Sequence, residues 1–463
     1  MPASIPEYAS SRSAAIAAAR TLRQVMTGSV VLPEDGTPYQ NCLKIWNGAV
    51  KARPALFAVC QKTQDVAAAI RTARDHGLPI SVRSGGHDWA GRALRDDALV
   101  IDLTGMRGIE VDSGNRVASC QGGTRGIDLC DAAAPHSLVG MTSNCGPVGL
   151  AGLYLGGGYG PLSAKYGLAS DNLLGADLVL ADGRTLRVSN SENPELLWAL
   201  RGGGGNFGVV TSLSVRLQPA APLLAGIMLF PLSDAGTVLR GYATLMAQAG
   251  DELTIGAGML CGPDGTPAAF LAPVWNGGLA RGEELIRELR TLGKPLLEQV
   301  GVMSYGDLLR MYDNYTVNGR HYDIQTRWMS DLTPEAIELL VRAGRHMTSP
   351  FSIINIHHLH GAATRVHPDS AAFAQRRKHF MLEMIAGWEP SSFEKGDVHR
   401  QWGWNLTQAL TPFALPGAYP NIVGPREGDR ARLAFGNNLR RLQEIKRQYD
   451  PDGVFAPSIP LVA

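Results

Sequence analysis

The chain has 463 residues, which exceeds the size of a single hydrophobic core, so more than one domain is expected. Hydrophobic residues make up 45% and charged residues 18% of the sequence, a balance typical of a folded globular protein rather than a disordered one. The formal net charge of +1 gives no electrostatic basis for binding nucleic acid or an anionic membrane surface.

The six cysteines show neither C-x-x-C spacing nor the pattern of a disulfide scaffold. The N-terminal residues lack the continuous apolar run of a signal peptide. Both observations indicate a cytoplasmic protein whose thiols stay reduced.

The first half of the chain alternates short helices and strands. Apolar residues at helical spacing predict the helices, and alternating or continuous apolar runs predict the strands. In chain order we expect helices at 13–26 and 63–76, strands at 80–82, 99–103 and 116–120, a helix at 127–134, strands at 176–180 and 185–188, a helix at 193–200, and a strand at 209–215.

Composition changes at Pro219-Ala220-Ala221-Pro222, which predicts a domain boundary. Beyond it, strands mix with helices expected at 281–292 and 333–347. An Arg-rich amphipathic helix is expected at 428–447, near the end of the chain.

One informative segment runs from Arg83 to Arg92 and follows the strand at 80–82. Adjacent Gly85 and Gly86 allow positive φ and close backbone approach, so the turn suits a pyrophosphate. The next residue is His87, whose ring nitrogen is nucleophilic near neutral pH. The combination favours a nucleotide cofactor bonded to the protein.

A second Gly-rich segment, Asn144 to Gly160, begins with Cys145. Asp171-Asn172 follows and can supply polar contacts. A third Gly-rich segment at 202–208 precedes a strand rather than joining a strand to a helix, which argues against a nicotinamide-binding fingerprint.

Together these residues resemble the vanillyl-alcohol-oxidase-type flavoproteins and, among them, the berberine-bridge-enzyme-like oxidases with bicovalent flavin. The resemblance implies that His87 bonds the 8α-methyl of FAD and that Cys145 bonds C6 of the isoalloxazine. It extends over roughly residues 45 to 455 and includes a C-terminal signature, seen here at 419–421, 435–442 and 449–455.

The fold that the resemblance implies is α+β, with a PCMH-type FAD-binding domain of two subdomains and a substrate domain whose antiparallel sheet is backed by helices. We expect the FAD-binding domain at 1–219 with its core at about 45–219, and the substrate domain at 220–412. Residues 413–463 are expected to return to the FAD-binding domain.

The resemblance also implies FAD as the cofactor and gives a set of contacts to it. The expected cofactor-binding residues are His87, Cys145, Arg83, Ser84, Gly85, Gly86, Asp88, Gly91, Val148, Gly149, Gly152, Gly157, Gly158, Tyr159, Gly160, Asn172, Gly205, Asn206, Gly208, Val210, Tyr419 and Asn421. We expect no metal.

The implied activity is oxidation of a small organic substrate by hydride transfer to flavin N5, with O2 reduced to H2O2. The oxidised group could be an alcohol, an amine or a C–H site of a secondary metabolite or sugar. Val148, three residues after Cys145, stands where a small residue is associated with oxygen access. A flavin dehydrogenase using another acceptor and a flavoprotein catalysing a net non-redox cyclisation remain alternatives.

The chain departs from many relatives at the catalytic base, because Ile422 stands where they have Tyr. Residues 353–362 form an expected strand with His358 and His360 on one face and His357 on the other. We expect His358 or His360 to be the base, with Tyr419 as the next candidate; the alternative is that these histidines only link neighbouring strands.

Overall fold

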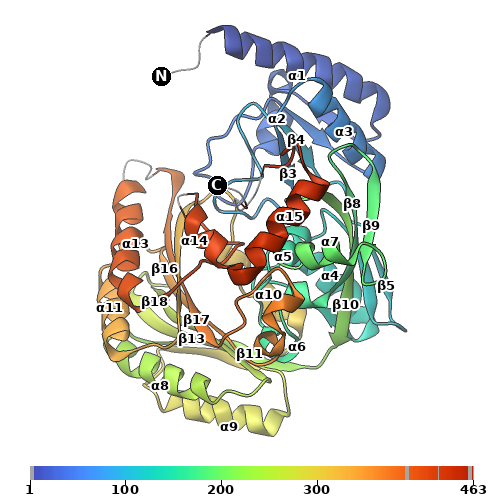
Figure 1. The fold of residues 1–463 in the computed structure, drawn as a ribbon. Helices are drawn as coiled ribbons and strands as arrows, with labels where there is room; N and C mark the ends of the chain where they lie inside the picture. The colour runs from blue at the N-terminus through green and yellow to red at the C-terminus, as the bar shows by residue number, and fades with distance from the viewer. Residues whose placement is uncertain (1–4, 392–395, 426, 457–460, 462–463) are drawn as a thin grey trace.

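The structure, a computed structural model, describes residues 5–391, 396–425, 427–456 and 461. The described residues form three β-sheets, with helices packed against them (Figure 1). The α+β prediction is confirmed. No helix in these ranges combines the length and apolar character needed to cross a bilayer.

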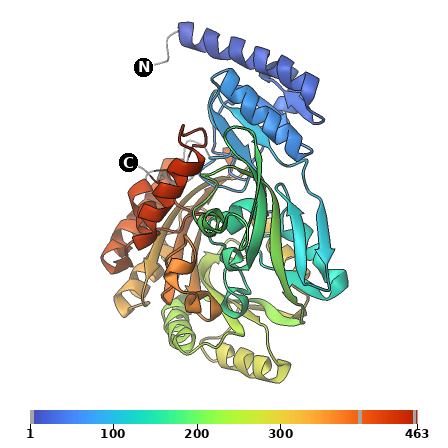
Figure 2. The ribbon, with the colours of Figure 1, turned by 45° about the vertical axis from the view of Figure 1, so that its right-hand side comes forward.

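The first sheet has the order β1-β2-β4-β3, and its strands β2, β4 and β3 run parallel. The strands are β1 (Ser29–Val31), β2 (Leu56–Val59), β3 (Ile80–Arg83) and β4 (Leu99–Asp102). Helices α1 (Ile5–Val25) and α3 (Thr63–Asp75) pack together beside it, at one end of the molecule (Figure 2). Apolar residues of both helices and of the strands form one buried cluster.

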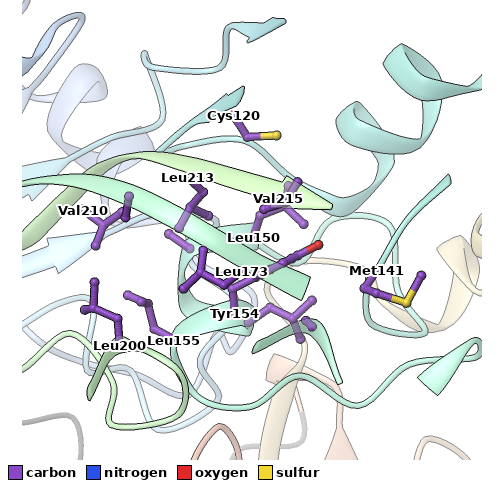
Figure 3. Close-up of a cluster of buried hydrophobic side chains, with 14 of the residues drawn as sticks. Cys120, Met141, Leu150, Tyr154, Leu155, Leu173, Leu200, Val210, Leu213 and Val215 are labelled. Atoms are coloured by element: carbon purple, nitrogen blue, oxygen red, sulfur yellow. The ribbon is translucent and has the colours of Figure 1, made fainter. Parts of the chain in front are cut away.

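The second sheet is antiparallel, with the order β5-β6-β10-β8-β9 and β7 paired to β10. Its strands are β5 (Ile109–Asp112), β6 (Val117–Gln121), β7 (Leu138–Gly140), β8 (Leu173–Val179), β9 (Thr185–Ser189) and β10 (Val209–Pro219). Buried side chains of this sheet, including Cys120 and Leu213, form a cluster with Leu150 and Tyr154 of α5 (Leu150–Leu155) (Figure 3). This packing fixes α5 directly after the Cys145 loop.

The third sheet is antiparallel, with the order β14-β11-β13-β12-β16-β17-β15-β18. Its strands are β11 (Leu223–Pro231), β12 (Leu253–Cys261), β13 (Pro267–Trp275), β14 (Leu297–Met303), β15 (His321–Met329), β16 (Ile353–Leu359), β17 (His379–Trp388) and β18 (Ala414–Leu415). Helices α8 (Ala235–Ala247), α9 (Leu279–Arg290), α11 (Pro334–Arg345) and α13 (Gly396–Leu410) share a buried apolar cluster with it. The expected antiparallel sheet backed by helices is therefore confirmed.

The helix expected at 428–447 is divided into α14 (Gly428–Leu433) and α15 (Leu439–Tyr449). Gly436, with φ of 48°, lies in the turn between them, a conformation that ends a regular helix. Helix α15 packs against α7 (Pro194–Leu200), where Arg441 pairs with Glu195 (Figure 1). The C-terminal helix thereby lies against the residues that precede the 202–208 loop.

Candidate active site

A cavity of about 810 Å³ lies between the Gly-rich loops and the third sheet. The loops that carry His87 and Cys145 border it on one side. On the other side it is bordered by residues of β12, β13, β15, β16 and β17. Segments that are far apart in the sequence therefore line one cavity.

The His87 and Cys145 loops touch at Gly85 and Gly149. A Cβ added to Gly85 would lie 2.4 Å from the backbone nitrogen of Gly149, and a Cβ added to Gly149 would lie 2.4 Å from that of Gly85. Only glycine at both positions allows this approach. The contact brings both nucleophile-bearing loops to the same cavity.

The imidazole of His87 is held in a mostly apolar setting. Its ring stacks on that of Trp46, with centroids 4.3 Å apart and an interplanar angle of 11°. Burial lowers the pKa of His87 to about 4, so the ring is neutral at pH 7. The Nε2 atom is buried and has no hydrogen-bond partner among the described residues.

Cys145 begins a tight turn in which its backbone N–H donates to Ser143 Oγ at 3.2 Å. Burial raises the pKa of its thiol to about 12, so the thiol is protonated at pH 7. Val148 borders the cavity three residues later, and Gly152 follows on α5. A Cβ at Gly152 would meet nothing within 4 Å, so a planar group has room beside this helix.

Tyr419 holds the Gly-Gly-Tyr turn that follows α5. Its hydroxyl oxygen accepts hydrogen bonds from the backbone N–H of Gly158 at 2.9 Å and of Tyr159 at 3.1 Å. Asn421 Nδ2 donates to the same oxygen at 3.1 Å. Burial raises the pKa of Tyr419 to about 12. These three N–H groups tie the Gly-Gly-Tyr turn to the Tyr419 hydroxyl, and they favour its phenolate form, whereas burial disfavours it.

A polar cluster lies on the cavity face of the third sheet, where Asn355 and Glu383 are paired residues of β16 and β17. Asn355 Nδ2 donates to Glu383 Oε2 at 2.9 Å and lies 2.8 Å from His357 Nε2. The amide of Asn355 thus links the carboxyl group of Glu383 to the ring of His357. Glu383 is 7% exposed. A carboxyl group and an imidazole therefore lie side by side at the cavity.

His358 and His360, the expected candidates for the base, are both partly held by contacts away from the cavity. Atoms of both residues border the cavity, but the ring of His358 stacks on Phe380 at 4.4 Å, and Phe380 belongs to the apolar cluster under the helices. His360 Nε2 donates to the carbonyl of Leu253 at 2.9 Å. The pKa of His358 is lowered to about 3, mainly by burial and secondly by the charge of the neighbouring His360. Side chains alternate along β16, so His357 rather than His358 shares the face of Asn355.

Most of the expected cofactor-binding residues border the cavity. They are Ser84, Gly85, Gly86, His87, Asp88, Gly91, Cys145, Val148, Gly149, Gly152, Tyr159, Gly160, Gly205, Gly208, Val210, Tyr419 and Asn421.

Five of the expected residues do not border the cavity. They are Arg83, Gly157, Gly158, Asn172 and Asn206. Arg83 donates to the carbonyls of Cys42 and Lys44 and so holds a neighbouring loop. Asn172 and Asn206 donate to backbone carbonyls within their own turns, and their role in the structure is to fix these turns.

Sequence reasoning missed Glu383, Asn355 and Trp46. Glu383 had a usable signal, because it is the acidic residue inside the otherwise apolar run 380–388. Asn355 and Trp46 had no comparable signal, since a lone amide or indole in a chain of this length is ordinary.

The residues present fit a large planar dinucleotide. Gly152 and Gly205 have open space where a Cβ would stand, and both border the cavity. The unpartnered Nε2 of His87 adds a buried polar atom that a ligand could engage. Among the described residues, no three His, Cys, Asp or Glu side chains are grouped to hold a metal ion.

These features define a flavoprotein, and the comparisons with known proteins agree. Residues 54–189 match the family described as FAD binding domain, and residues 418–460 match the family described as berberine and berberine like. The chain is 39% identical over 448 residues to (R)-6-hydroxynicotine oxidase of Paenarthrobacter nicotinovorans, covering 92% of this chain and 95% of that protein. The chain therefore belongs to the berberine-bridge-enzyme-like family of FAD-linked oxidoreductases.

Solved structures share the fold. The structure of 6-hydroxy-D-nicotine oxidase from Arthrobacter nicotinovorans matches with a TM-score of 0.83 and 29% identity, over 94% of this chain and 98% of that one. Glucooligosaccharide oxidase from Acremonium strictum, whose FAD is 6-S-cysteinyl and 8α-N1-histidyl, matches with a TM-score of 0.82 and 24% identity, over 97% of this chain and 99% of that one. The protein is an FAD-linked oxidoreductase.

Proposed function

We propose that the protein is an oxidase that carries FAD bonded to both His87 and Cys145 and oxidises a small amine, with O2 reduced to H2O2. The observation that carries this proposal is the contact of Gly85 with Gly149, which brings the two nucleophile-bearing loops to one cavity. The same pair of linkages is named for the glucooligosaccharide oxidase that shares the fold. Residues 220–412 would then be the substrate domain, with 1–219 and 413–463 forming the FAD-binding domain.

When bound, FAD supplies a hydride acceptor, and O2 regenerates its oxidised form. The chain's own task is to orient the substrate and to remove a proton. We assign removal of the substrate's proton to the carboxylate of Glu383. Asn355 orients this carboxylate, and burial in the cavity keeps the carboxylate largely out of water. His357 lies beside it, with Nε2 3.4 Å from Glu383 Oε2, and can share the proton.

An amine fits this site better than a neutral sugar. A buried carboxylate attracts the ammonium form and can take its proton, which leaves the nitrogen lone pair free to assist hydride loss. Apolar side chains of the third sheet, Ile227, Phe270 and Ile353, border the same cavity and would contact a hydrocarbon ring. The 39% identical relative is named for oxidation of 6-hydroxynicotine, which contains both an amine and an aromatic ring.

Two measurements test the proposal. In the first, the protein is precipitated with acid and digested, and the peptides carrying His87 and Cys145 are weighed. Both should carry the mass of FAD, and His87→Ala and Cys145→Ala should each keep FAD through the remaining bond. Release of all flavin by acid would refute the covalent part.

The second measurement records anaerobic bleaching of the flavin by 6-hydroxynicotine and by a glucooligosaccharide, followed by admission of air. The amine should bleach the flavin and the sugar should not, and air should restore the colour with formation of H2O2. Bleaching without reoxidation by O2 would instead favour a dehydrogenase.

A further inference from the structure

Three aromatic rings form a column that ends at His87. The ring of Tyr322, on β15, stacks on Trp46 with centroids 4.3 Å apart and an interplanar angle of 21°. Trp46 in turn stacks on His87 at 4.3 Å and 11°. The column therefore runs from the third sheet, through the segment before β2, to the loop that carries the nucleophile.

Backbone hydrogen bonds hold Trp46 between the two sides. Its N–H donates to the carbonyl of Gly86 at 3.0 Å, and its carbonyl accepts from the N–H of Gly319 at 2.9 Å. The next residue, Asn47, is 3% exposed, and its Nδ2 donates to the carbonyl of Tyr322 at 2.9 Å. Its Oδ1 accepts from the Tyr322 N–H at 2.9 Å. The backbone on either side of the Trp46 indole is thus hydrogen-bonded both to the His87 loop and to the segment that contains Gly319 and Tyr322.

The column adds to the few contacts that orient the ring of His87. The last torsion of a histidine side chain is soft and is usually set by a hydrogen bond to a ring nitrogen. Nε2 of His87 has no such partner among the described residues, and the hydrogen bond that the ring makes is to the residue's own backbone. Stacking on Trp46 restricts rotation of the His87 ring out of the plane parallel to the indole, although the ring can still shift within that plane. Both ring nitrogens therefore stay in one plane.

We propose that Trp46 and Tyr322 are positioning residues for attachment of FAD to His87, so that this attachment requires the third sheet to be docked. The inference rests on the proposed covalent linkage. Attachment forms one bond between an imidazole nitrogen and the 8α carbon of FAD and breaks one C–H bond at that carbon. The imidazole and the carbon each release a proton. The electron pair of the broken bond reduces the ring system by two electrons, and O2 takes both electrons and both protons to leave as H2O2.

The test isolates the His87 bond in the Cys145→Ala background. The readout is the fraction of bound flavin that stays with acid-precipitated protein, followed in time after addition of FAD in air. Trp46→Leu should slow attachment by about tenfold or more, because poor orientation of reacting groups costs rate steeply. Trp46→Phe keeps a stacking ring and should restore most of the rate. Tyr322→Leu should slow attachment, and Tyr322→Phe should not.

Trp89→Leu is the control for general loosening, because Trp89 lies two residues from His87 and packs in the same buried cluster as Tyr322 and Trp46, but its ring does not stack in the column. Its loss should lower thermal stability but leave the attachment rate near that of the parent. Equal slowing in Trp89→Leu and Trp46→Leu would mean general loosening of the loop and would overturn the proposal. If Trp46→Leu does not fold, an undiminished rate in Tyr322→Leu overturns it. Absence of a His87 bond in the Cys145→Ala parent itself would instead refute the covalent linkage.

Discussion

Asn355 Nδ2 donates to Glu383 Oε2 across the pairing of β16 with β17, at 2.9 Å. The two strands thereby orient a carboxylate that lies on the cavity face of a sheet whose other face is apolar. A buried carboxyl group needs such a partner, and Glu383 is the group to which we assign proton removal in the proposed function.

Replacing Glu383 with Gln should lower the rate of flavin reduction by about two to four orders of magnitude, because a general base is lost while the shape is kept. FAD content and thermal stability should stay near wild type. The rate is measured by anaerobic stopped-flow with saturating substrate. A rate within a few-fold of wild type would remove Glu383 from the mechanism, and His357→Gln would then be the next variant to measure.

His358→Leu should leave the rate of flavin reduction within about threefold of wild type, since a packing change away from the reacting groups acts mainly on stability. The structural reason is the stacking of His358 on Phe380, beneath the helices. A hundredfold loss of rate with normal FAD content would show instead that the sequence-based assignment of the base to this histidine was correct.

Acid should destabilise the protein through its buried neutral histidines. Burial lowers the pKa of His87 and His379 to about 4 and of His358 to about 3, whereas an exposed histidine titrates near 6.5. Between these values the unfolded chain binds more protons than the folded chain, so stability falls as the pH falls from about 6.5 towards 4. Each such histidine contributes about 1.4 kcal/mol per pH unit in this window.

The check on this pH dependence is the midpoint of urea unfolding at pH 7 and at pH 5. His358→Leu removes one of these groups and should show a smaller drop between the two pH values than wild type. Equal drops in both proteins would mean that His358 is protonated in the folded state or shielded in the unfolded one.

Gly85→Ala should damage both flavin bonds at once, because its Cβ would lie 2.4 Å from the backbone of Gly149. Overpacking of this kind costs about 1 to 3 kcal/mol and separates the loops. Gly152→Ala is the contrasting variant, since its Cβ meets nothing within 4 Å and projects beside the cavity. It should keep the melting temperature but weaken FAD binding. Acid-stable flavin content and thermal melting distinguish the two effects.

Val148→Ile should slow reoxidation of the reduced protein by O2, because added bulk at the cavity wall narrows the space beside Cys145. The half-reaction with air-saturated buffer is followed at the flavin absorbance after anaerobic reduction. Flavin reduction by substrate should change little. Unchanged reoxidation would mean that oxygen reaches the site by another route.

The two loops could be predicted from the sequence because their glycines and nucleophiles are local signals. The sequence could not predict which face of β16 points toward the cavity. The alternation itself is right, with His357 opposite His358, but both faces of the strand are covered and carry apolar residues, so the pattern does not say which face is inward. The break at Gly436 was missed for a related reason, since the amphipathic pattern continues on both sides of it.

Close to the end of the chain, Lys446 donates from Nζ to the carbonyl of Asn206 at 2.7 Å and to that of Phe455 at 3.0 Å, and Phe455 pairs with Ile80 at the start of β3. The strand that leads to His87 and the loop around Asn206 are therefore completed by residues that are synthesised about 300 residues after Cys145. A nascent chain has both nucleophiles long before these contacts can form. Loading with FAD should accordingly follow synthesis of the segment from Lys446 to Phe455, and chains stalled before Lys446 should be colourless and open to proteolysis.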